Sequence, residues 1–446
     1  MILKSITIGN FKNIDLTTLD LRKMISLISV NNYGKSNLID AIRFGFDFIT
    51  ASAKARNTMM HWTKGIPLVA PLADKDFTFL IEFEDSSLED YRYVRYGYSF
   101  SWIKDDGSGA TITNETLEIR SNESVRYTSY LKRNSGKYKA GKSKTGFRNI
   151  SLAKDTLAID IISSLDNVDI SNVVTAIKSI GYRMCNSLEL DDSFQPGVIE
   201  FDFTPDSKFP FDDNDIPRAL NLLNQKNPQQ YTLFLETIYD LFPEFKEIKL
   251  QSYTLKEEDS QKLKALIDSS ASASSTATTV QEHEPKVPYR IRDEIYRLII
   301  QSIYLNQPIS MEHMSTGTKR IFWLIANAIF GESYGINLLG VDEIETSIHP
   351  RMTKNLLESL NDILGDASMI LTSHSPYIIQ YLKPESIYIG VPNDQGLAKF
   401  KRIQPSKIKN ILSISRDLEV SIGEYLFELM SGDKDSADIL LSYLEG

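Results

Sequence analysis

The chain has 446 residues, of which 24% are charged, and a formal net charge of −10. The length predicts two or three lobes, and the acidic balance argues against a surface that attracts nucleic acid over its whole area. The single cysteine excludes an internal disulfide framework and a multi-cysteine zinc site. Because no signal-peptide core and no membrane-length apolar window is present, we expect a cytoplasmic protein without membrane partners.

Near the N-terminus, an apolar strand over residues 25–30 runs into N-N-Y-G-K-S and then a helical pattern. Strand, tight loop and helix form the context of the phosphate-binding pattern G-x-x-x-x-G-K-[ST]. Ser29 stands at the first glycine position, whereas Gly34, Lys35 and Ser36 match. The backbone N–H groups of such a loop cradle phosphates, so we expect Lys35 to reach the β- and γ-phosphates of ATP and Ser36 to ligate Mg²⁺.

Aromatic-rich antiparallel strands are predicted over residues 77–84, 91–103 and 111–120. Residues 120–150 then reverse the charge of the chain, with Glu123 as their only acid. Two interpretations stay open: a nucleic-acid contact with interleaved aromatic side chains, or a solvated insertion loop. The basic residues are Arg120, Arg126, Lys132, Arg133, Lys137, Lys139, Lys142, Lys144 and Arg148.

The middle of the chain is predicted to be mainly helical over residues 151–267, followed by a flexible Ser/Ala/Thr-rich linker over 268–285. From residue 286 helices alternate with apolar strands, which indicates a parallel α/β core. The first of these helices is predicted over residues 291–304 and the second over 319–330.

Three further segments carry candidate chemistry. An apolar strand ends in Asp342 and Glu343, which suit a water-mediated contact to Mg²⁺ and the orientation or deprotonation of the attacking water. His374 follows the next apolar strand, where it either contacts the γ-phosphate or serves as a structural histidine. The segment S-T-G-T-K-R, residues 315–320, opens a helix and suits a second anion site, which is compatible with a helix cap at Ser315.

Four sequence motifs, in their order along the chain, resemble those of the ABC/SMC/RecF-type ATPases. The resemblance covers residues 1–110 and 290–395. The motifs are I-T-I-G-N-F-K-N, N-N-x-G-K-S-N, S-T-G-T-K-R and V-D-E-I-E-T-S-I-H-P. They are similar to stand-alone predicted ATPases related to RecF and the OLD nucleases. The resemblance implies an α/β fold: an ABC/SMC-type ATPase head, with a mixed sheet core, an antiparallel β lobe and a mainly helical insertion.

The resemblance also implies a composite site between two heads that meet head-to-tail, with ATP and Mg²⁺ as cofactors. Ser315 and Gly317 of one chain would then contact the γ-phosphate held by Lys35 and Ser36 of the other, and residues 345–349 would cross the interface. The catalytic residues would be Lys35, Glu343 and His374, and the metal ligands Ser36 and Asp342. The other nucleotide contacts would be Lys12, Asn31, Asn32, Gly34, Asn37, Ser315, Gly317, Thr318 and Arg320.

Several roles are compatible with such an ATPase. The chain resembles the ATPase subunits of the two-gene anti-phage systems Septu and PARIS, which implies a nucleotide-gated sensor and scaffold for a separate effector nuclease. A RecF-like DNA-repair clamp is the alternative, with residues 120–150 as its footprint. An OLD-type nuclease needs a further domain after His374, for which Asp433-Lys434-Asp435 is a poor candidate. A transporter head is disfavoured by the long insertion.

The predicted domain organisation follows these segments. Residues 1–119 and 286–404 would form the two halves of the ATPase head. Between them lie the basic insertion loop 120–150, the helical insertion 151–267 and the linker 268–285. Two amphipathic helices are expected over 405–446, where they either pack on the core or contact a partner or a second copy.

Overall fold

The computed structural model describes residues 1–133, 137–138, 148–149, 151–162, 170–185, 192–195, 197–201, 215–273, 289–391 and 395–445. The contacts between residues divide the chain into two compact units. The first unit comprises Met1–Ser187, Gly335–Thr346 and Asn361–Gly446, and the second comprises Leu188–Tyr334 and Ser347–Leu360. Both ends of the chain therefore belong to the same unit.

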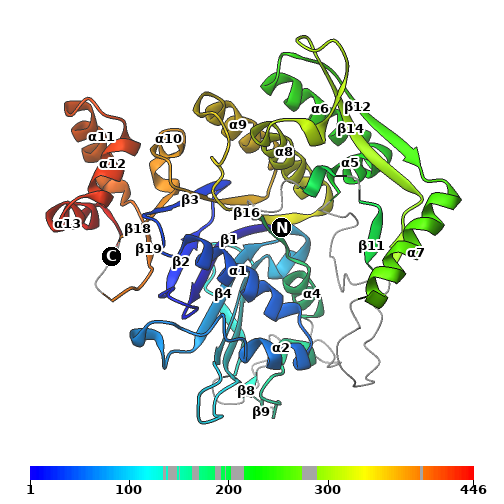
Figure 1. Cartoon of the computed structure of the whole chain (residues 1–446). Coiled ribbons are helices and arrows are strands. Elements are labelled where there is room, and N and C mark those ends of the chain that lie inside the picture. Colours follow the sequence, from blue (N-terminus) through cyan, green and yellow to red (C-terminus); the bar gives the residue numbers. More distant parts are fainter. Residues whose placement is uncertain are drawn as a thin grey trace. The chain divides into compact units, whose positions relative to one another are not determined.

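Six strands form the core sheet of the first unit, in the order β10-β16-β17-β3-β18-β19, with β3, β16 and β18 labelled in Figure 1. The strands from β10 to β18 pair in parallel, and β19 pairs antiparallel to β18. Every residue of β3 and β17 is buried, which is typical of the central strands of a parallel sheet. The bounds are β3 Met24–Ser29, β10 Gly181–Cys185, β16 Ile336–Val341, β17 Ser368–Ser373, β18 Ile387–Gly390 and β19 Phe400–Arg402.

The second sheet of this unit is antiparallel, with eight strands in the order β2-β1-β4-β5-β6-β7-β8-β9. Its β4 alternates strictly between buried and half-buried residues, as a strand with one face on the core does. The bounds are β1 Ile2–Gly9, β2 Thr17–Asp20, β4 Phe77–Glu84, β5 Tyr93–Ser101, β6 Thr111–Arg120, β7 Thr128–Lys132, β8 Lys137–Tyr138 and β9 Arg148–Asn149.

Helix α1 (Lys35–Thr50) packs on both sheets, through β1 of the antiparallel sheet and through β3 and β10 of the core sheet. Gly45 allows the close approach to β4, because a Cβ there would lie 2.2 Å from the ring of Phe79. This packing fixes the start of α1 relative to the end of β3. The other helices of the unit are α2 Ala53–Met60, α3 Ala158–Ile162, α4 Ser171–Ser179, α10 Pro376–Ile379, α11 Ile408–Asp417, α12 Ile422–Ser431 and α13 Lys434–Tyr443.

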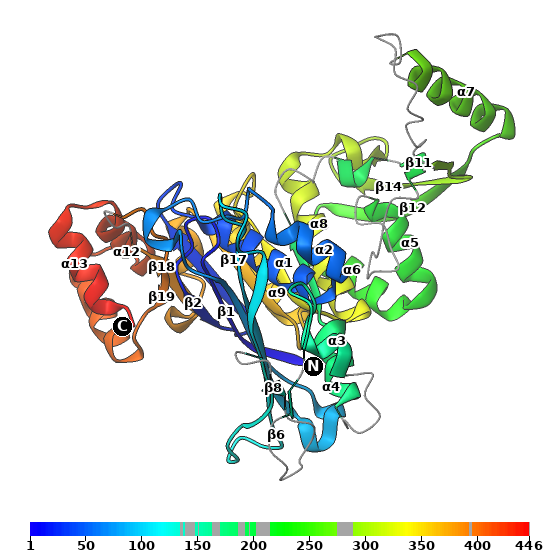
Figure 2. The same ribbon diagram turned by 90° about the horizontal axis from the view of Figure 1, so that it is seen from below.

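The C-terminal helices α11 to α13 share a buried cluster with β18, and Figure 2 shows α12 and α13 in red near β18. Tyr425 and Leu426 of α12 share a buried cluster with Ile387 and Ile389 of β18. The two helices predicted over 405–446 are thus three, and they pack on the core of their own unit. Asp433 caps α13 by accepting from the Ser436 N–H at 3.0 Å, so its carboxylate serves a helix N-terminus.

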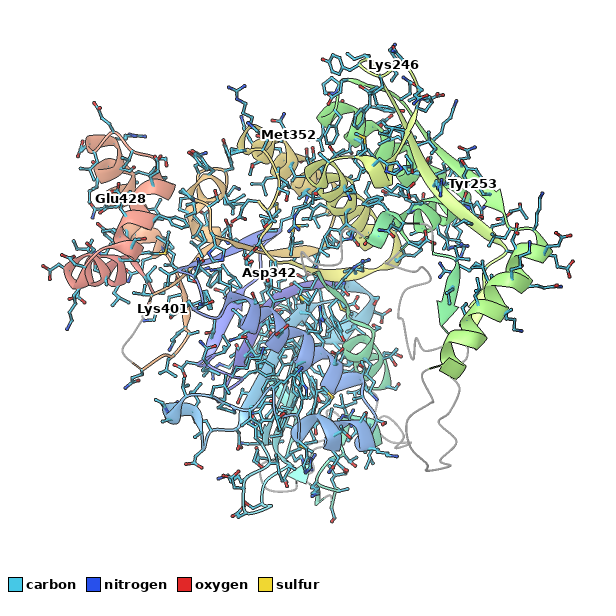
Figure 3. The ribbon with its side chains drawn as sticks, viewed as in Figure 1. Lys246, Tyr253, Asp342, Met352, Lys401 and Glu428 are labelled. Carbon is cyan, nitrogen blue, oxygen red and sulfur yellow. The ribbon has the colours of Figure 1, made fainter. Side chains whose placement is uncertain are left out.

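The second unit is built around helix α8 (Thr316–Tyr334), in which Lys319 to Gly331 are all buried. The helix packs on α5 and α6, where Phe322 meets the rings of Phe234 and Phe242. Strands β12, β14 and β15 form an antiparallel sheet in that order, and β12 carries Lys246 and Tyr253, labelled in Figure 3. The bounds are α5 Ile216–Lys226, α6 Pro228–Leu241, α7 Glu257–Ala273, α9 Pro350–Ile363, β11 Ile199–Phe201, β12 Phe245–Thr254, β13 Tyr289–Ile291, β14 Glu294–Ser302 and β15 Ile309–Ser310.

The helix predicted over residues 291–304 is wrong, because Glu294–Ser302 forms strand β14. Its β-branched and aromatic residues favour a strand, and pairing with β12 along its whole length satisfies the backbone. The prediction of a mainly helical segment over 151–267 also missed two strands, β10 and β12. Strand β10 completes the core sheet beside β16. The predicted linker begins inside α7, which extends to Ala273, and residues 274–288 lie outside the described residues.

The basic segment 120–150 is not a single loop, because β7, β8 and β9 extend the antiparallel sheet through it. Arg133 is only 9% exposed and donates hydrogen bonds to the carbonyl oxygens of Thr156 and Ala153. The guanidinium of Arg120 stacks on Tyr127, with its carbon 4.5 Å from the ring centre. Two of the predicted phosphate contacts are thus engaged within the fold, whereas the side chains of residues 134–150 lie outside the described residues.

No helix among the described residues is long and apolar enough to cross a membrane. The cytoplasmic location stays a prediction.

Candidate functional site

Three adjacent strands of the core sheet end at the same edge. In the order β16-β17-β3 they run parallel, so their carboxyl ends point in one direction. The phosphate-binding loop follows β3, Asp342 and Glu343 follow β16, and His374 follows β17. Loops at the carboxyl ends of parallel strands form the usual ligand crevice of open α/β sheets.

The loop after β3 takes the backbone conformation of an anion cradle. Asn32 and Gly34 both have positive φ, of 57° and 125°. No side chain caps the N-terminus of α1 and no acid lies in its first turn, so the first N–H groups of the helix have no side-chain cap. A Cβ on Gly34 would also come within 2.9 Å of Asn13 Oδ1, which explains the need for glycine. The result is a helix N-terminus prepared for a phosphate group.

Lys35 turns back over the loop rather than into solvent. Its Nζ donates to the carbonyl oxygen of Ser29 at 3.0 Å, to Ser29 Oγ at 3.2 Å and to the carbonyl oxygen of Val30 at 3.3 Å. Burial lowers the pKa of Lys35 to about 8, although the carboxylates nearby raise it. Ser29, which replaces the first glycine of the pattern, therefore supplies two acceptors to the lysine.

Asp342 is held by hydroxyl groups of both neighbouring segments. Ser36 Oγ donates to Asp342 Oδ2 at 2.8 Å, and Thr372 Oγ1 donates to Oδ1. Asp342 is labelled in Figure 3 where β16 ends. A hydroxyl and a carboxylate oxygen this close form the donor pair that Mg²⁺ accepts when it also keeps waters and phosphate oxygens. The residues present therefore fit a magnesium ion bound together with nucleotide phosphates.

Glu343 lies in a strained turn directly after β16, with φ of 49°. Its N–H donates to Thr372 Oγ1 at 2.8 Å, and its Oε2 accepts from Thr346 Oγ1 at 3.2 Å. Its other oxygen lies 3.6 Å from His374 Nε2. These contacts hold the carboxylate at the rim of the loop rather than along the strand.

His374 lies between the lysine and the glutamate. Its Nδ1 is 3.2 Å from Lys35 Nζ, so this nitrogen accepts from the ammonium group and the ring proton belongs on Nε2, toward Glu343. Burial, followed by the charge of Lys35, lowers the pKa of His374, so the ring is neutral at pH 7. A neutral histidine with an Nε2–H can donate a hydrogen bond to a phosphate oxygen.

A cavity of about 720 Å³ lies over these groups. Its volume is within the range of small-molecule and cofactor sites. Of the residues predicted for the site, the structure brings residues 31–37 apart from the unpredicted Tyr33, with Glu343 and His374, to this cavity, whereas Asp342 and Lys12 do not line it. The lining residues are Asn31, Asn32, Tyr33, Gly34, Lys35, Ser36, Asn37, Glu343, Glu345, Thr346 and His374.

Lys12 approaches the start of α1 from the N-terminal segment. Its Nζ donates to Asn37 Oδ1 at 3.0 Å and pairs with Asp40 Oδ2 at 2.9 Å. Asn13, the next residue, accepts from Asn37 Nδ2 at 2.8 Å and donates to the Tyr33 carbonyl oxygen at 2.9 Å. The segment after β1 thus braces the phosphate-binding loop from outside.

The predicted second anion site at residues 315–320 begins α8 in the second unit. Ser315 Oγ accepts from the Thr318 N–H at 3.2 Å and lies 2.8 Å from Thr318 Oγ1, so the cap expected there is present. A Cβ on Gly317 would lie 2.3 Å from the carbonyl oxygen of Ser347. Arg320 is only 2% exposed, which disfavours a direct role in charge stabilisation for a ligand outside its unit.

Several residues of the site did not stand out in the sequence. Thr372 and Ser373 belong to an apolar strand, yet their hydroxyl groups bind the acids that follow β16. Tyr33 occupies a variable position of the loop pattern, yet its hydroxyl donates to the Val391 carbonyl oxygen at 2.9 Å and anchors the loop on β18. A polar residue inside an otherwise apolar strand was the available signal for Thr372 and Ser373.

Comparisons with known proteins concern most of the chain. Residues 30–380 match the family model described as "AAA domain, putative AbiEii toxin, Type IV TA system". Among curated proteins, none matches the chain in sequence. Among solved structures, the chain resembles an SMC head bound to the C-winged helix domain of ScpA, with a TM-score of 0.51 and 13% identity over 92% of this chain and 100% of that one.

Two further SMC heads match over similar lengths. The head from Thermotoga maritima has a TM-score of 0.42 and 11% identity, over 91% of this chain and 100% of that one. The head with an extended coiled coil, bound to the C-terminal domain of ScpA derived from Pyrococcus furiosus, has a TM-score of 0.44 and 12% identity, over 93% and 99%. The first likeness, with the family match, confirms the predicted α/β fold of an ABC/SMC-type head.

Proposed function

The chain belongs to the family of AAA domains described as putative AbiEii toxin of type IV toxin–antitoxin systems, and from that premise we propose how this AAA/SMC-type ATPase binds and uses ATP. The observation that carries the proposal is that Lys35, Ser36, Glu343 and His374 line one cavity. Asp342 is joined to this group through its hydrogen bond with Ser36 Oγ. Phosphate cradle, metal donors and a carboxylate for water are the parts that phosphoryl transfer to water requires.

Each part has a separate task. The N–H groups at the start of α1 and the ammonium group of Lys35 bind the β- and γ-phosphates. Ser36 and Asp342 hold Mg²⁺, which when bound neutralises charge that develops on the phosphate oxygens. Glu343 orients the attacking water and accepts its proton, and His374 donates its Nε2–H to the γ-phosphate.

We extend the proposal to a composite site between two copies of the chain. Ser315 is exposed at the start of α8, and its cap leaves the hydroxyl oxygen accessible at a helix N-terminus. In a head-to-tail dimer, this helix N-terminus faces the γ-phosphate on the partner copy. ATP then links the two heads, and hydrolysis releases them.

The substitution Glu343→Gln tests this cycle. The amide keeps the size of the side chain but accepts no proton, so we expect nucleotide binding to persist while turnover falls by about 100-fold or more. Trapped ATP should convert the variant to a dimer, measured by light scattering with and without Mg·ATP. A variant that turns over at the wild-type rate would remove Glu343 from the chemistry. A variant that stays monomeric with ATP bound would remove the composite site.

Mixing two inactive variants tests the composite site directly. Lys35→Ala loses the phosphate contact, and Ser315→Arg obstructs the contact from the partner copy. If the site is shared, the Ser315→Arg chain of a mixed dimer supplies the intact phosphate-binding loop and the Lys35→Ala chain supplies the intact Ser315. One complete site then forms, so the mixture should hydrolyse ATP although neither variant does so alone. A mixture that stays inactive, with both variants folded and dimeric, contradicts the shared site.

For the cellular role, we propose a nucleotide-gated sensor and scaffold for a separate effector nuclease in anti-phage defence. The family description names a toxin–antitoxin system, which favours a role with a second gene product. The nuclease and the anti-phage trigger rest on the sequence resemblance alone. The RecF-like clamp is less well supported, because Arg120 and Arg133 of its expected DNA footprint are engaged within the fold.

The experiment is co-purification of tagged Glu343→Gln protein expressed from its own operon, with protein mass and nucleic-acid content measured together. A stoichiometric nuclease subunit is the expected result. A dimer that retains DNA, with no protein partner, would replace the scaffold by the clamp.

A further inference from the structure

Glu345 lies beside the proposed catalytic groups, and nothing in the ATPase cycle above uses its carboxylate. The turn after β16 runs next to the end of β17, with the Ile344 N–H 3.3 Å from the carbonyl oxygen of Thr372. This register brings Glu345 level with residues 373 and 374. Its side chain is half-buried and lines the nucleotide cavity.

One oxygen of Glu345 receives two hydrogen bonds from the end of β17. Oε1 accepts from the backbone N–H of His374 at 2.6 Å and from Ser373 Oγ at 3.0 Å. Ser373 Oγ in turn accepts from the N–H of Ser375 at 2.9 Å, which extends the contact to the cap of α10. Through these two hydrogen bonds to Oε1, Glu345 connects the end of β17 to the turn after β16.

The position of the His374 ring depends on that backbone. The ring is held between Lys35 at 3.2 Å and Glu343 at 3.6 Å, two side chains that belong to other segments. A displacement of about 1 Å at residue 374 would break both contacts, because neither distance leaves room for it. The carboxylate that binds the His374 N–H therefore also holds the His374 ring in its position between Lys35 and Glu343.

The second oxygen of Glu345, Oε2, is buried and has no hydrogen-bond partner among the described residues. An apolar residue would avoid the cost of burying this oxygen without a partner. The carboxylate thus stabilises the arrangement of the site at the expense of its own solvation. Such a local cost is typical of residues that hold functional groups in place.

We propose that Glu345 is a positioning residue for ATP hydrolysis, which acts through the backbone of His374 to hold its imidazole between Lys35 and Glu343. The inference rests on the ATPase function proposed above. It assigns to Glu345 a contact within its own chain, although the sequence resemblance implied that residues 345–349 cross to a partner.

Three substitutions separate position from charge. Glu345→Gln keeps an oxygen that accepts both hydrogen bonds, so kcat should stay within about threefold of the wild type. Glu345→Ala removes the acceptor, and Glu345→Asp keeps the charge but is one methylene too short. Both should lower kcat by about tenfold or more with the KM for ATP within about threefold, because the ground-state phosphate contacts remain. Thermal unfolding of each variant identifies a loss of fold, and Glu345→Gln and Glu345→Asp keep the test valid if the alanine variant unfolds.

A double-mutant cycle with His374→Ala provides the decisive readout. If Glu345 acts through His374, the variant Glu345→Ala/His374→Ala should be no slower than His374→Ala alone. Additive losses of kcat would overturn the proposal, and so would wild-type rates in both Glu345→Ala and Glu345→Asp. A glutamine variant as inactive as the alanine variant would make the carboxylate a participant in the chemistry, which also overturns it. Failure of the wild-type chain to hydrolyse ATP would instead contradict the proposed function.

Discussion

Two helix N-termini were predicted as anion sites, and they differ in how their first N–H groups are satisfied. At the start of α1 no side chain caps the helix, and the residue before it is a glycine with φ of 125°. At the start of α8, Ser315 Oγ already accepts from the Thr318 N–H. At α8 the cap satisfies one of the first N–H groups of the helix, whereas at α1 none of them has a side-chain acceptor.

This difference indicates which helix start holds the nucleotide and which one would only contact it. Around α1 the chain provides Lys35 and the Ser36–Asp342 pair, all within one unit. Around α8 it provides a hydroxyl group and a helix dipole, while the two cations of the first turns, Lys319 and Arg320, are buried. We therefore expect substitutions at α1 to affect binding and those at α8 to affect turnover.

The largest expected effect is at Lys35. Lys35→Ala removes the ammonium group that donates to the loop carbonyl groups, so the affinity for Mg·ATP should fall by about 100-fold or more, measured by calorimetry. Ser315→Ala should leave the affinity of the monomer unchanged, and Lys54→Ala, at an exposed position of α2, serves as a matched lysine control. Normal ATP binding by Lys35→Ala would remove the assignment of the site to α1.

The second effect concerns pH. In the nucleotide-free protein the pKa of Lys35 is about 8, below its ordinary value of 10.5. Its ammonium group therefore loses a proton as the pH rises through 8. ATP affinity should fall by about tenfold between pH 7.5 and 9, because binding then requires uptake of a proton. ATP is fully ionised in this range and His374 is neutral, so neither contributes.

The same shift has the opposite sign for folding. Between pH 8 and 10.5 the unfolded chain binds more protons at Lys35 than the folded one, so this group makes the nucleotide-free protein more stable as pH rises. Calorimetric titrations and thermal unfolding across this range measure both trends. A flat profile of affinity would show that Lys35 stays charged in the free site.

The smallest effect distinguishes a cap from a functional contact at α8. Ser315→Ala should cost about 1 kcal/mol of unfolding free energy, as loss of an N-cap does. Ser421→Ala, which removes the cap of α12, should cost a similar amount and serves as a matched control. Only Ser315→Ala should also lower turnover, because only Ser315 faces the partner nucleotide in the proposed dimer. Equal turnover in the two variants would show that Ser315 serves only as a helix cap.

The outcome of the sequence analysis differed between the phosphate-binding loop and two other segments of the chain. The loop 29–36 was recognisable because its residues are contiguous, and local backbone geometry determines how they cradle an anion. The helix predicted over 291–304 was wrong because alternation and helical periodicity overlap in a short apolar segment, and only pairing with β12 decides between them. Arg133 looked like a phosphate contact by charge, but Glu115 and two carbonyl groups hold it inside the fold.

The sequence by itself determined the chemistry present at each strand end: a phosphate-binding loop, two acids and a histidine, each directly after an apolar strand. Only the tertiary structure decided that these groups meet, since Ser36 and Asp342 are 306 positions apart and come together through the strand order β16-β17-β3. It alone also revealed Thr372, Ser373 and Glu345 as the groups that hold the acids and the histidine in place. Their roles depend on the register between neighbouring segments, and no local pattern encodes a contact between residues that distant in the chain.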